Sequence, residues 1–143
     1  FGISASYHSA FSQKLDNENF ERILIERENK HIAEFLVEIA DSKEKRQKGL
    51  MYKKKLLPNH GMLFDFKSSM KVSFWMKNTY IPLDLIFIDK SGFILKIYEN
   101  AVPLSTDPIN SILPVRAVLE INAGMIKKYN IKTGDKVIYI IFK

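Results

Sequence analysis

The feature that most constrains the fold is the stretch of residues 72–89, in which a short polar insert separates two strongly apolar runs. Apolar side chains alternate in the second run, which is the period-two pattern of a β-strand. The sequence therefore predicts strands at 72–76 and 83–89, joined by a linker that Pro82 stiffens. A purely structural connector would not need the polar residues of this insert, so we expect a functional site there.

Similar patterns predict the other elements of a mostly β domain of the α+β class. Strands are expected at 20–26, 32–40, 62–66, 93–98, 116–122 and 137–142. A short helix should follow Asp41, which with Glu44 resembles a capping box, and should end at Gly49. A second helical turn or two is expected at 125–129. Residues 99–114 contain three prolines and are predicted to form a long irregular loop.

Length and composition predict one domain preceded by an arm. A chain of 143 residues with 46% hydrophobic residues fills a single core. Residues 1–19 are polar and weakly periodic, which is typical of a flexible N-terminal arm or leader remnant, and the domain itself should span 20–143. The chain starts at Phe1, followed by small polar residues, as in an exported protein after signal removal; a truncated chain would look the same.

Several classes of function have no support in the sequence. There is no cysteine, which excludes thiol catalysis, disulfides and cysteine-bound metals. The three histidines are too scattered for a metal site, and no phosphate-binding loop or nucleophile elbow occurs, so neither metal nor cofactor is expected. The net charge of +6 favours a solvated basic face over nucleic-acid binding, because no nucleic-acid module accompanies it. No apolar run is long enough to span a membrane.

A series of short motifs runs from about Phe35 to the end of the chain. In order they are Gly49-Leu50-Met51, Gly61-Met62-Leu63-Phe64, Phe74-Trp75-Met76-Lys77-Asn78-Thr79, Pro82-Leu83-Asp84, Phe87-Ile88-Asp89, Val118-Leu119-Glu120 and Gly134-Asp135-Lys136-Val137. The series resembles that of the DUF192 family, also called UPF0127. This resemblance implies a small barrel-like β domain and, since many members are exported, an extracytoplasmic location in the bacterial periplasm or cell envelope. The family has no assigned biochemical function, so no catalytic residue carries over.

Individual residues of the central stretch each allow a structural and a functional interpretation. A tryptophan on a strand is usually buried, yet Trp75 shares a face with Lys77 and could form a ligand platform there. Asp84 is expected either to cap backbone N–H groups or to pair with Lys77. Glu120 is expected to pair with Arg116 when partly buried.

The leading hypothesis is a non-enzymatic, exported domain whose cleft binds a small polar ligand or an envelope protein. The predicted cleft residues are Trp75, Lys77, Asn78 and Asp84, with Asn100 and Arg116 behind them. One alternative is an envelope glycan hydrolase or lyase that uses Asp84 and Glu120 as a general acid and base. Another is a structural module that stabilises an envelope complex through its basic face.

Overall fold

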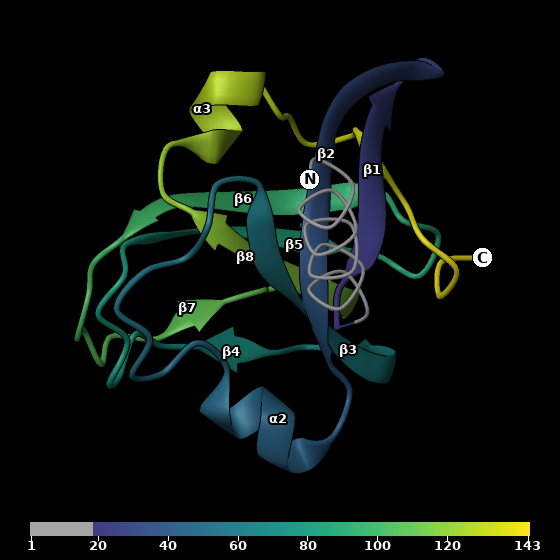
Figure 1. The fold of residues 1–143 in the computed structure, drawn as a ribbon. Helices are drawn as coiled ribbons and strands as arrows, with labels where there is room; N and C mark the ends of the chain where they lie inside the picture. The colour runs from purple at the N-terminus through teal and green to yellow at the C-terminus, as the bar shows by residue number, and fades with distance from the viewer. Residues whose placement is uncertain (1–18) are drawn as a thin grey trace, which may run out of the picture.

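The structure, a computed structural model, describes residues 19–143 as a curled seven-stranded sheet with a two-stranded ribbon and two short helices (Figure 1). The elements are β1 (Glu21–Arg27), β2 (Lys30–Ala40), α2 (Lys43–Lys48), β3 (His60–Met70), β4 (Ser73–Phe74), β5 (Leu83–Ile88), β6 (Ile94–Ala101), β7 (Ile109–Asn110), β8 (Val115–Asn122), α3 (Met125–Tyr129) and β9 (Lys136–Ile138). The predicted fold class is confirmed. The predicted arm lies outside the described residues, except for Asn19. No described helix is long and apolar enough to cross a membrane.

The first hairpin forms where the sequence predicts it. Glu28 and Asn29 adopt positive φ angles of 51° and 63°, and this two-residue turn lets Arg27 pair directly with Lys30. Two successive residues with positive φ form the turn type that matches the twist of antiparallel strands. The alternation in β2 then directs side chains such as Phe35 into the core.

The chain then crosses over to form the parallel pair of β2 and β3. Such a pair needs a long connection, and α2 lies within it. The predicted cap at Asp41 is wrong by one residue. The Ser42 hydroxyl accepts a hydrogen bond from the Lys45 N–H at 3.2 Å, while the Asp41 carboxylate lies 3.7 Å from the Lys45 ammonium. Gly49 ends the helix with a φ of 49°, as expected.

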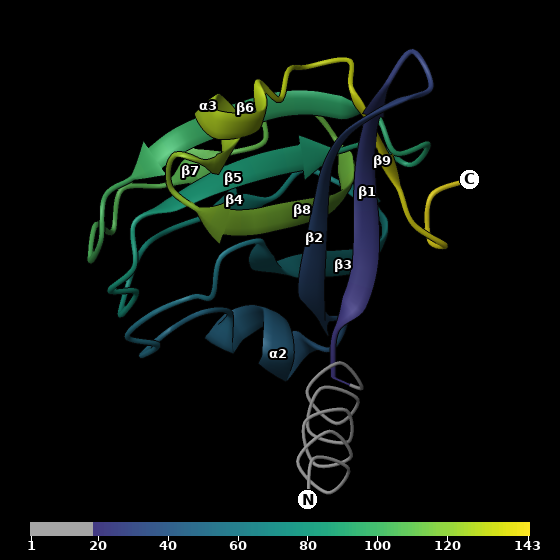
Figure 2. The ribbon, with the colours of Figure 1, turned by 45° about the horizontal axis from the view of Figure 1, so that its top comes forward.

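The seven-stranded sheet has the order β6-β5-β8-β3-β2-β1-β9 and curls until its two edge strands approach each other (Figure 2). The Ile94 N–H donates to the Asp135 carbonyl at 2.9 Å, and the Val137 N–H donates to the Gly92 carbonyl at 2.7 Å. The Arg27 guanidinium binds both oxygens of the buried Asp135 carboxylate, at 2.7 and 2.9 Å. These contacts give the barrel-like shape that the family resemblance implies.

The sheet carries an apolar core on each of its faces. One core receives side chains from all seven strands and fills the inside of the curl. The other lies on the outer face of β3, β5 and β8, and includes Met62, Leu85 and Val118. Figures 1 and 2 show α2 and α3 on opposite sides of the sheet. Two cores explain why every residue of β5 is buried.

The polar insert differs from its prediction. The expected strand at 72–76 is reduced to β4, which pairs with β7 inside the region predicted to be an irregular loop. The reason is that the chain turns early: the Met76 N–H bonds the Ser105 carbonyl at 2.8 Å, and Asn78 adopts a φ of 53°. The segment after β4 therefore leaves the ribbon and lies as a turn beside the outer core.

The side chain of Asp84, on the inner face of β5, connects two neighbouring segments of the chain. Its carboxylate is fully buried and accepts hydrogen bonds from the backbone N–H groups of Asn100 at 2.9 Å, Gly124 at 3.0 Å and Ile126 at 3.0 Å. The sequence-based interpretation of Asp84 as a capping carboxylate is thereby confirmed. It joins the end of β6 to the start of α3.

Asp84→Ala should therefore strongly destabilise the domain. The substitution leaves three backbone donors without their acceptor, and each buried unsatisfied group costs about 1–3 kcal/mol. We expect a loss of at least about 3 kcal/mol in urea unfolding. Asp107→Ala, which removes an exposed carboxylate, is the control and should change stability by less than about 0.5 kcal/mol. Equal effects of the two substitutions would refute the capping role.

Candidate functional site

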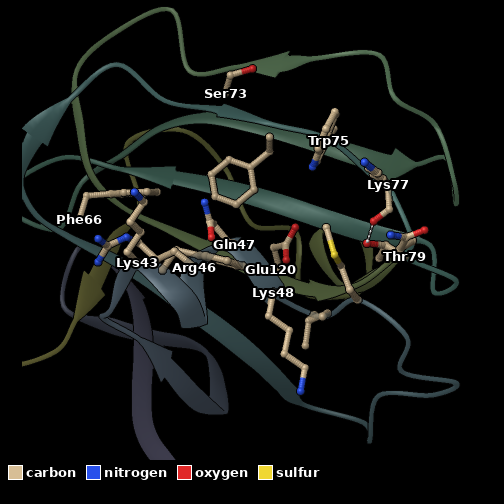
Figure 3. Close-up of a pocket in the computed structure, with 16 residues that line it drawn as sticks. Lys43, Arg46, Gln47, Lys48, Phe66, Ser73, Trp75, Lys77, Thr79 and Glu120 are labelled. Atoms are coloured by element: carbon tan, nitrogen blue, oxygen red, sulfur yellow. Dashed lines mark hydrogen bonds between the residues drawn. The ribbon is translucent and has the colours of Figure 1, made fainter.

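A pocket of about 520 Å³ opens on the outer face of the sheet, beside α2 and the turn that follows β4 (Figure 3). Its volume is in the range of small-molecule sites. It is lined by Lys43, Arg46, Gln47, Lys48, Gly49, Leu50, Met51, Phe64, Phe66, Ser73, Phe74, Trp75, Lys77, Asn78, Thr79 and Glu120.

Aromatic rings form the walls of the pocket. The Phe74 ring packs edge-on against Phe64 with the ring centroids 4.9 Å apart, and against Phe66 at 6.1 Å. Trp75 is 47% exposed, so the expectation that it is part of the core is wrong, because the chain turns away from the sheet directly after β4. Its ring instead carries the Lys77 ammonium at 5.1 Å from the centroid, a cation–π arrangement. The platform interpretation of Trp75 therefore fits the structure better.

Four cationic side chains line the pocket. Lys43, Arg46 and Lys48 come from α2, and Lys77 comes from the turn after β4. Among the described residues, none of these groups lies within 4.0 Å of a carboxylate. Arg46 donates to the backbone carbonyl of Asp65 at 3.0 Å and lies over the Phe66 ring at 5.9 Å. The pocket thus has an uncompensated positive potential.

A carboxyl group forms part of the pocket surface. Glu120 is on β8, only 4% exposed, in register with Met62 on one neighbouring strand and Leu85 on the other. No hydrogen bond or ion pair among the described residues involves its side chain. Burial among apolar neighbours raises the pKa of Glu120 to about 8. At neutral pH the group is therefore mostly a neutral acid, able to donate one hydrogen bond and accept others.

The predicted acid–base pair of Asp84 and Glu120 does not form. Glu120 is paired with Leu85 and Asp84 with Ile121, so the two carboxyl groups point to opposite faces of the sheet. Asp84 is also held by backbone donors inside the curl. The structure therefore offers no two-carboxylate site for glycoside hydrolysis at these positions.

Two predicted ion pairs are also absent. Lys77 lines the pocket on the outer face, whereas Asp84 is buried on the inner face, so they do not form a pair. Arg116 and Glu120 share a face of β8 but are four residues apart, about 13 Å along a strand. Arg116 pairs instead with Asp65.

The predicted ligand-binding residues thus fall into two groups. Trp75, Lys77 and Asn78 line the pocket, whereas Asp84, Asn100 and Arg116 do not. Asn100 contributes only its backbone N–H, to Asp84. The side of the pocket formed by α2 was not predicted. Two sequence features belong to this side of the pocket, the basic cluster at Lys43–Lys48 and the Gly49-Leu50-Met51 motif. Both lie far from the polar insert in sequence, and the connection between β2 and β3 brings them next to it.

A second pocket of about 470 Å³ shares Lys48 and Gly49 with the first. It is lined also by Glu38 and Lys53, whose charged groups lie 3.2 Å apart. Within residues 19–143, no group of three metal-ligating side chains is found. Because Lys48 borders both pockets, Lys43 and Lys77 are the more selective positions for testing the first.

The fold and the pocket define a class of small, curled β domain with an aromatic, cationic cavity that contains one buried acid. The chain belongs to the DUF192 family, described as "Uncharacterized ACR, COG1430", whose sequence profile matches residues 24–139. This confirms the resemblance noted in the sequence.

Two solved structures share the fold at substantial sequence identity. A protein of Sinorhizobium meliloti, described as a candidate transcription regulator, is 43% identical with a TM-score of 0.80, over 83% of this chain and 92% of its own. A protein of unknown function from Novosphingobium aromaticivorans is 35% identical with a TM-score of 0.79, over 84% of this chain and 85% of its own. No curated protein matches the sequence significantly.

The raised pKa of Glu120 predicts a pH-dependent stability. The carboxyl has an ordinary pKa of 4.5 in the unfolded chain and a pKa of about 8 when folded. Between these values the folded protein keeps a proton that the unfolded chain releases, so stability falls as pH rises from about 4.5 to about 8. Glu120→Gln should remove this dependence and stabilise the domain at pH 8 by on the order of 4 kcal/mol.

Urea unfolding at pH 5 and pH 8 tests this prediction. The exposed Glu99→Gln is the matched control and should keep the wild-type change of stability with pH. If Glu120→Gln also keeps it, Glu120 is ionised in the folded protein and the assignment is wrong.

The exposure of Trp75 makes a separate prediction. Trp75→Ala should cost about 1 kcal/mol or less, since much of the ring stays in water when the chain folds. Phe35→Ala, at a fully buried position, should cost about 3–5 kcal/mol. Similar losses for the two substitutions in urea unfolding would show that Trp75 is part of the core after all.

Proposed function

We propose that this domain is a non-enzymatic binding module that takes a small molecule in the 520 Å³ pocket. The observation that carries the proposal is the convergence of the family-like motifs on this cavity. Gly49-Leu50-Met51, the Phe74–Thr79 string except Met76, and Glu120 come from separate parts of the chain and line it. Motif residues that served folding alone would be expected in the core rather than around an open cavity.

The arrangement supports binding better than catalysis. Hydrolysis of a glycan by two carboxyl groups requires both on the same substrate, about 5–10 Å apart. Glu120 has no second carboxyl among the other residues that line the pocket. The aromatic walls and cationic groups instead resemble a ligand site, where a few polar groups orient a molecule against apolar surface. The extracytoplasmic location expected from the sequence stays a prediction.

Nucleic-acid binding is a second candidate from a different class. Two observations favour it: the run of basic residues at and after α2, and the neighbouring structure described as a candidate transcription regulator. Against it, α2 has only six residues and buries none of them, so it offers no long recognition helix. A titration with duplex DNA at two salt concentrations separates the candidates, because phosphate contacts give a steep salt dependence.

The proposed function is tested by a ligand screen with two independent readouts. Trp75 is the single tryptophan of the chain and lines the pocket, so a ligand there should change its fluorescence. The same ligand should raise the melting temperature, by the stabilisation expected when a molecule binds only the folded state. The library should contain anions, cations and neutral molecules, so that its outcome does not depend on one assumed chemistry.

Blocking the pocket provides the decisive variant. Ser73→Tyr places a large side chain at the exposed Ser73 position of the pocket lining and should weaken any true ligand by at least about tenfold, roughly 1.4 kcal/mol. Thr106→Tyr makes a similar change at an exposed residue that lines neither pocket and should leave affinity unchanged. Hits that bind equally well to both variants, or a complete absence of hits, would disprove binding at this site.

A further inference from the structure

We propose that the pocket, if it binds a small molecule as argued above, is specific for an organic anion with a flat aromatic body. Its negative group is held at the pocket rim by Lys77, with Lys43 and Arg46 adding positive potential from the opposite side, and a hydroxyl at its other end bonds the Glu120 carboxyl. The inference rests on the proposed function and adds the chemical class of the ligand.

The sign of the charge follows from the missing counter-ions. A cationic surface group is normally solvated or paired, but here several cations surround one cavity with no carboxylate within 4.0 Å among the described residues. Glu120 is the acidic residue in the pocket lining, and it makes no ion pair with the cationic side chains of the pocket. An anionic ligand would therefore meet favourable charges without displacing a carboxylate.

The arrangement of these cations places the anion near the edge of the cavity. Figure 3 shows Lys43 and Arg46 on one side, Lys77 on the other, and Glu120 between them. Lys77 is exposed, whereas Glu120 is almost completely buried. A charged group that keeps contact with water thus belongs at the rim beside Lys77, and a neutral polar group belongs beside the buried Glu120.

The flat body of the ligand follows from the walls. Phe64 and Phe66 each pack edge-on against Phe74, and the Trp75 ring is half exposed. All four rings line the pocket, so ring surface faces the cavity. Aromatic faces and edges pair best with another planar ring, which gains about 0.5–1.5 kcal/mol beyond its buried area. A saturated ring of similar size would lack this term.

The hydroxyl end follows from Glu120 itself. Its carboxyl opens into the pocket and forms no hydrogen bond to another described residue, so its polar atoms depend on what fills the pocket. A ligand hydroxyl can donate to its carbonyl oxygen and accept from its O–H when the acid is neutral. A ligand without such a group would leave the carboxyl unsatisfied, and sites of this kind reject analogues that lack the hydrogen-bonding group.

Three probes with one carbon skeleton separate these contributions. They are 4′-hydroxybiphenyl-4-carboxylate, biphenyl-4-carboxylate, which lacks the hydroxyl, and 4-hydroxybiphenyl, which lacks the charge. Affinities measured at pH 7 from Trp75 fluorescence or calorimetry should be highest for the first probe. Loss of the carboxylate and loss of the hydroxyl should each weaken binding at least about tenfold.

Variants of the protein should remove the same preferences one at a time. The double variant Lys43→Gln, Lys77→Gln should lose the preference for the carboxylate and bind 4-hydroxybiphenyl as before, whereas the exposed Lys90→Gln should behave as wild type. Glu120→Leu replaces the acid by an apolar side chain suited to its surroundings and should bind the two carboxylates equally well. Each variant should lose one preference between probes while it stays folded. General destabilisation of the domain would weaken the binding of all probes alike.

The outcomes distinguish the inference from the function on which it rests. Screen hits that are cationic or saturated, are lost in Ser73→Tyr and exceed the three probes in affinity would overturn the ligand class while leaving the binding module intact. Equal binding of charged and uncharged probes, or an unchanged hydroxyl preference in Glu120→Leu, would overturn the assigned contacts. No binding of any molecule would overturn both.

Discussion

The burial of β3, β5 and β8 on both faces is the constraint on which the rest of the structure depends. A strand with one face in water needs only one core, but these strands require cover on both faces. The curl of the sheet provides it inside, and the segment after α2 provides it outside together with the β4–β7 ribbon. The outer cover is incomplete, and the pocket lies where it is incomplete. Glu120 is at the outward-facing position beside this gap. The alternation of side chains along β8 therefore determines both the packing of the strand and the place of the carboxyl group with the raised pKa.

Sequence reasoning was successful where structure is local. The turn at Glu28 and Asn29, the Asp89–Gly92 hairpin and the 125–129 helix follow from short-range chemistry, and the structure contains them all. It failed for β4 and β7, because two-residue strands exist only through contacts between distant segments. The exposure of Trp75 has the same origin: no periodicity signals that the chain turns off the ribbon after Phe74.

The candidate site shows a similar division. The polar insert identified Trp75, Lys77 and Asn78, because polar groups in an apolar stretch are informative on their own. The contribution of α2 to the pocket could not be predicted from the sequence, because only the parallel pairing of β2 with β3 brings that helix close to the polar insert. Asp84 and Glu120 looked like partners in the sequence, and the ladder register of β5 with β8 separates them onto two faces. Which face a side chain occupies is decided by register, which depends on the partner strand.

The closure of the sheet has a consequence for how the domain behaves among its neighbours. Open sheets expose two rows of unpaired backbone groups that invite other chains to add strands. Here the segment before β6 and strand β9 meet at the bridge between Phe93 and Lys136, and charged side chains such as Lys96 lie along the outer strand β6. The two edges therefore cover each other where they meet, around residues 92–94 and 134–137. At high local concentration, this meeting of the edges hinders the addition of a strand from another molecule at that end of the sheet.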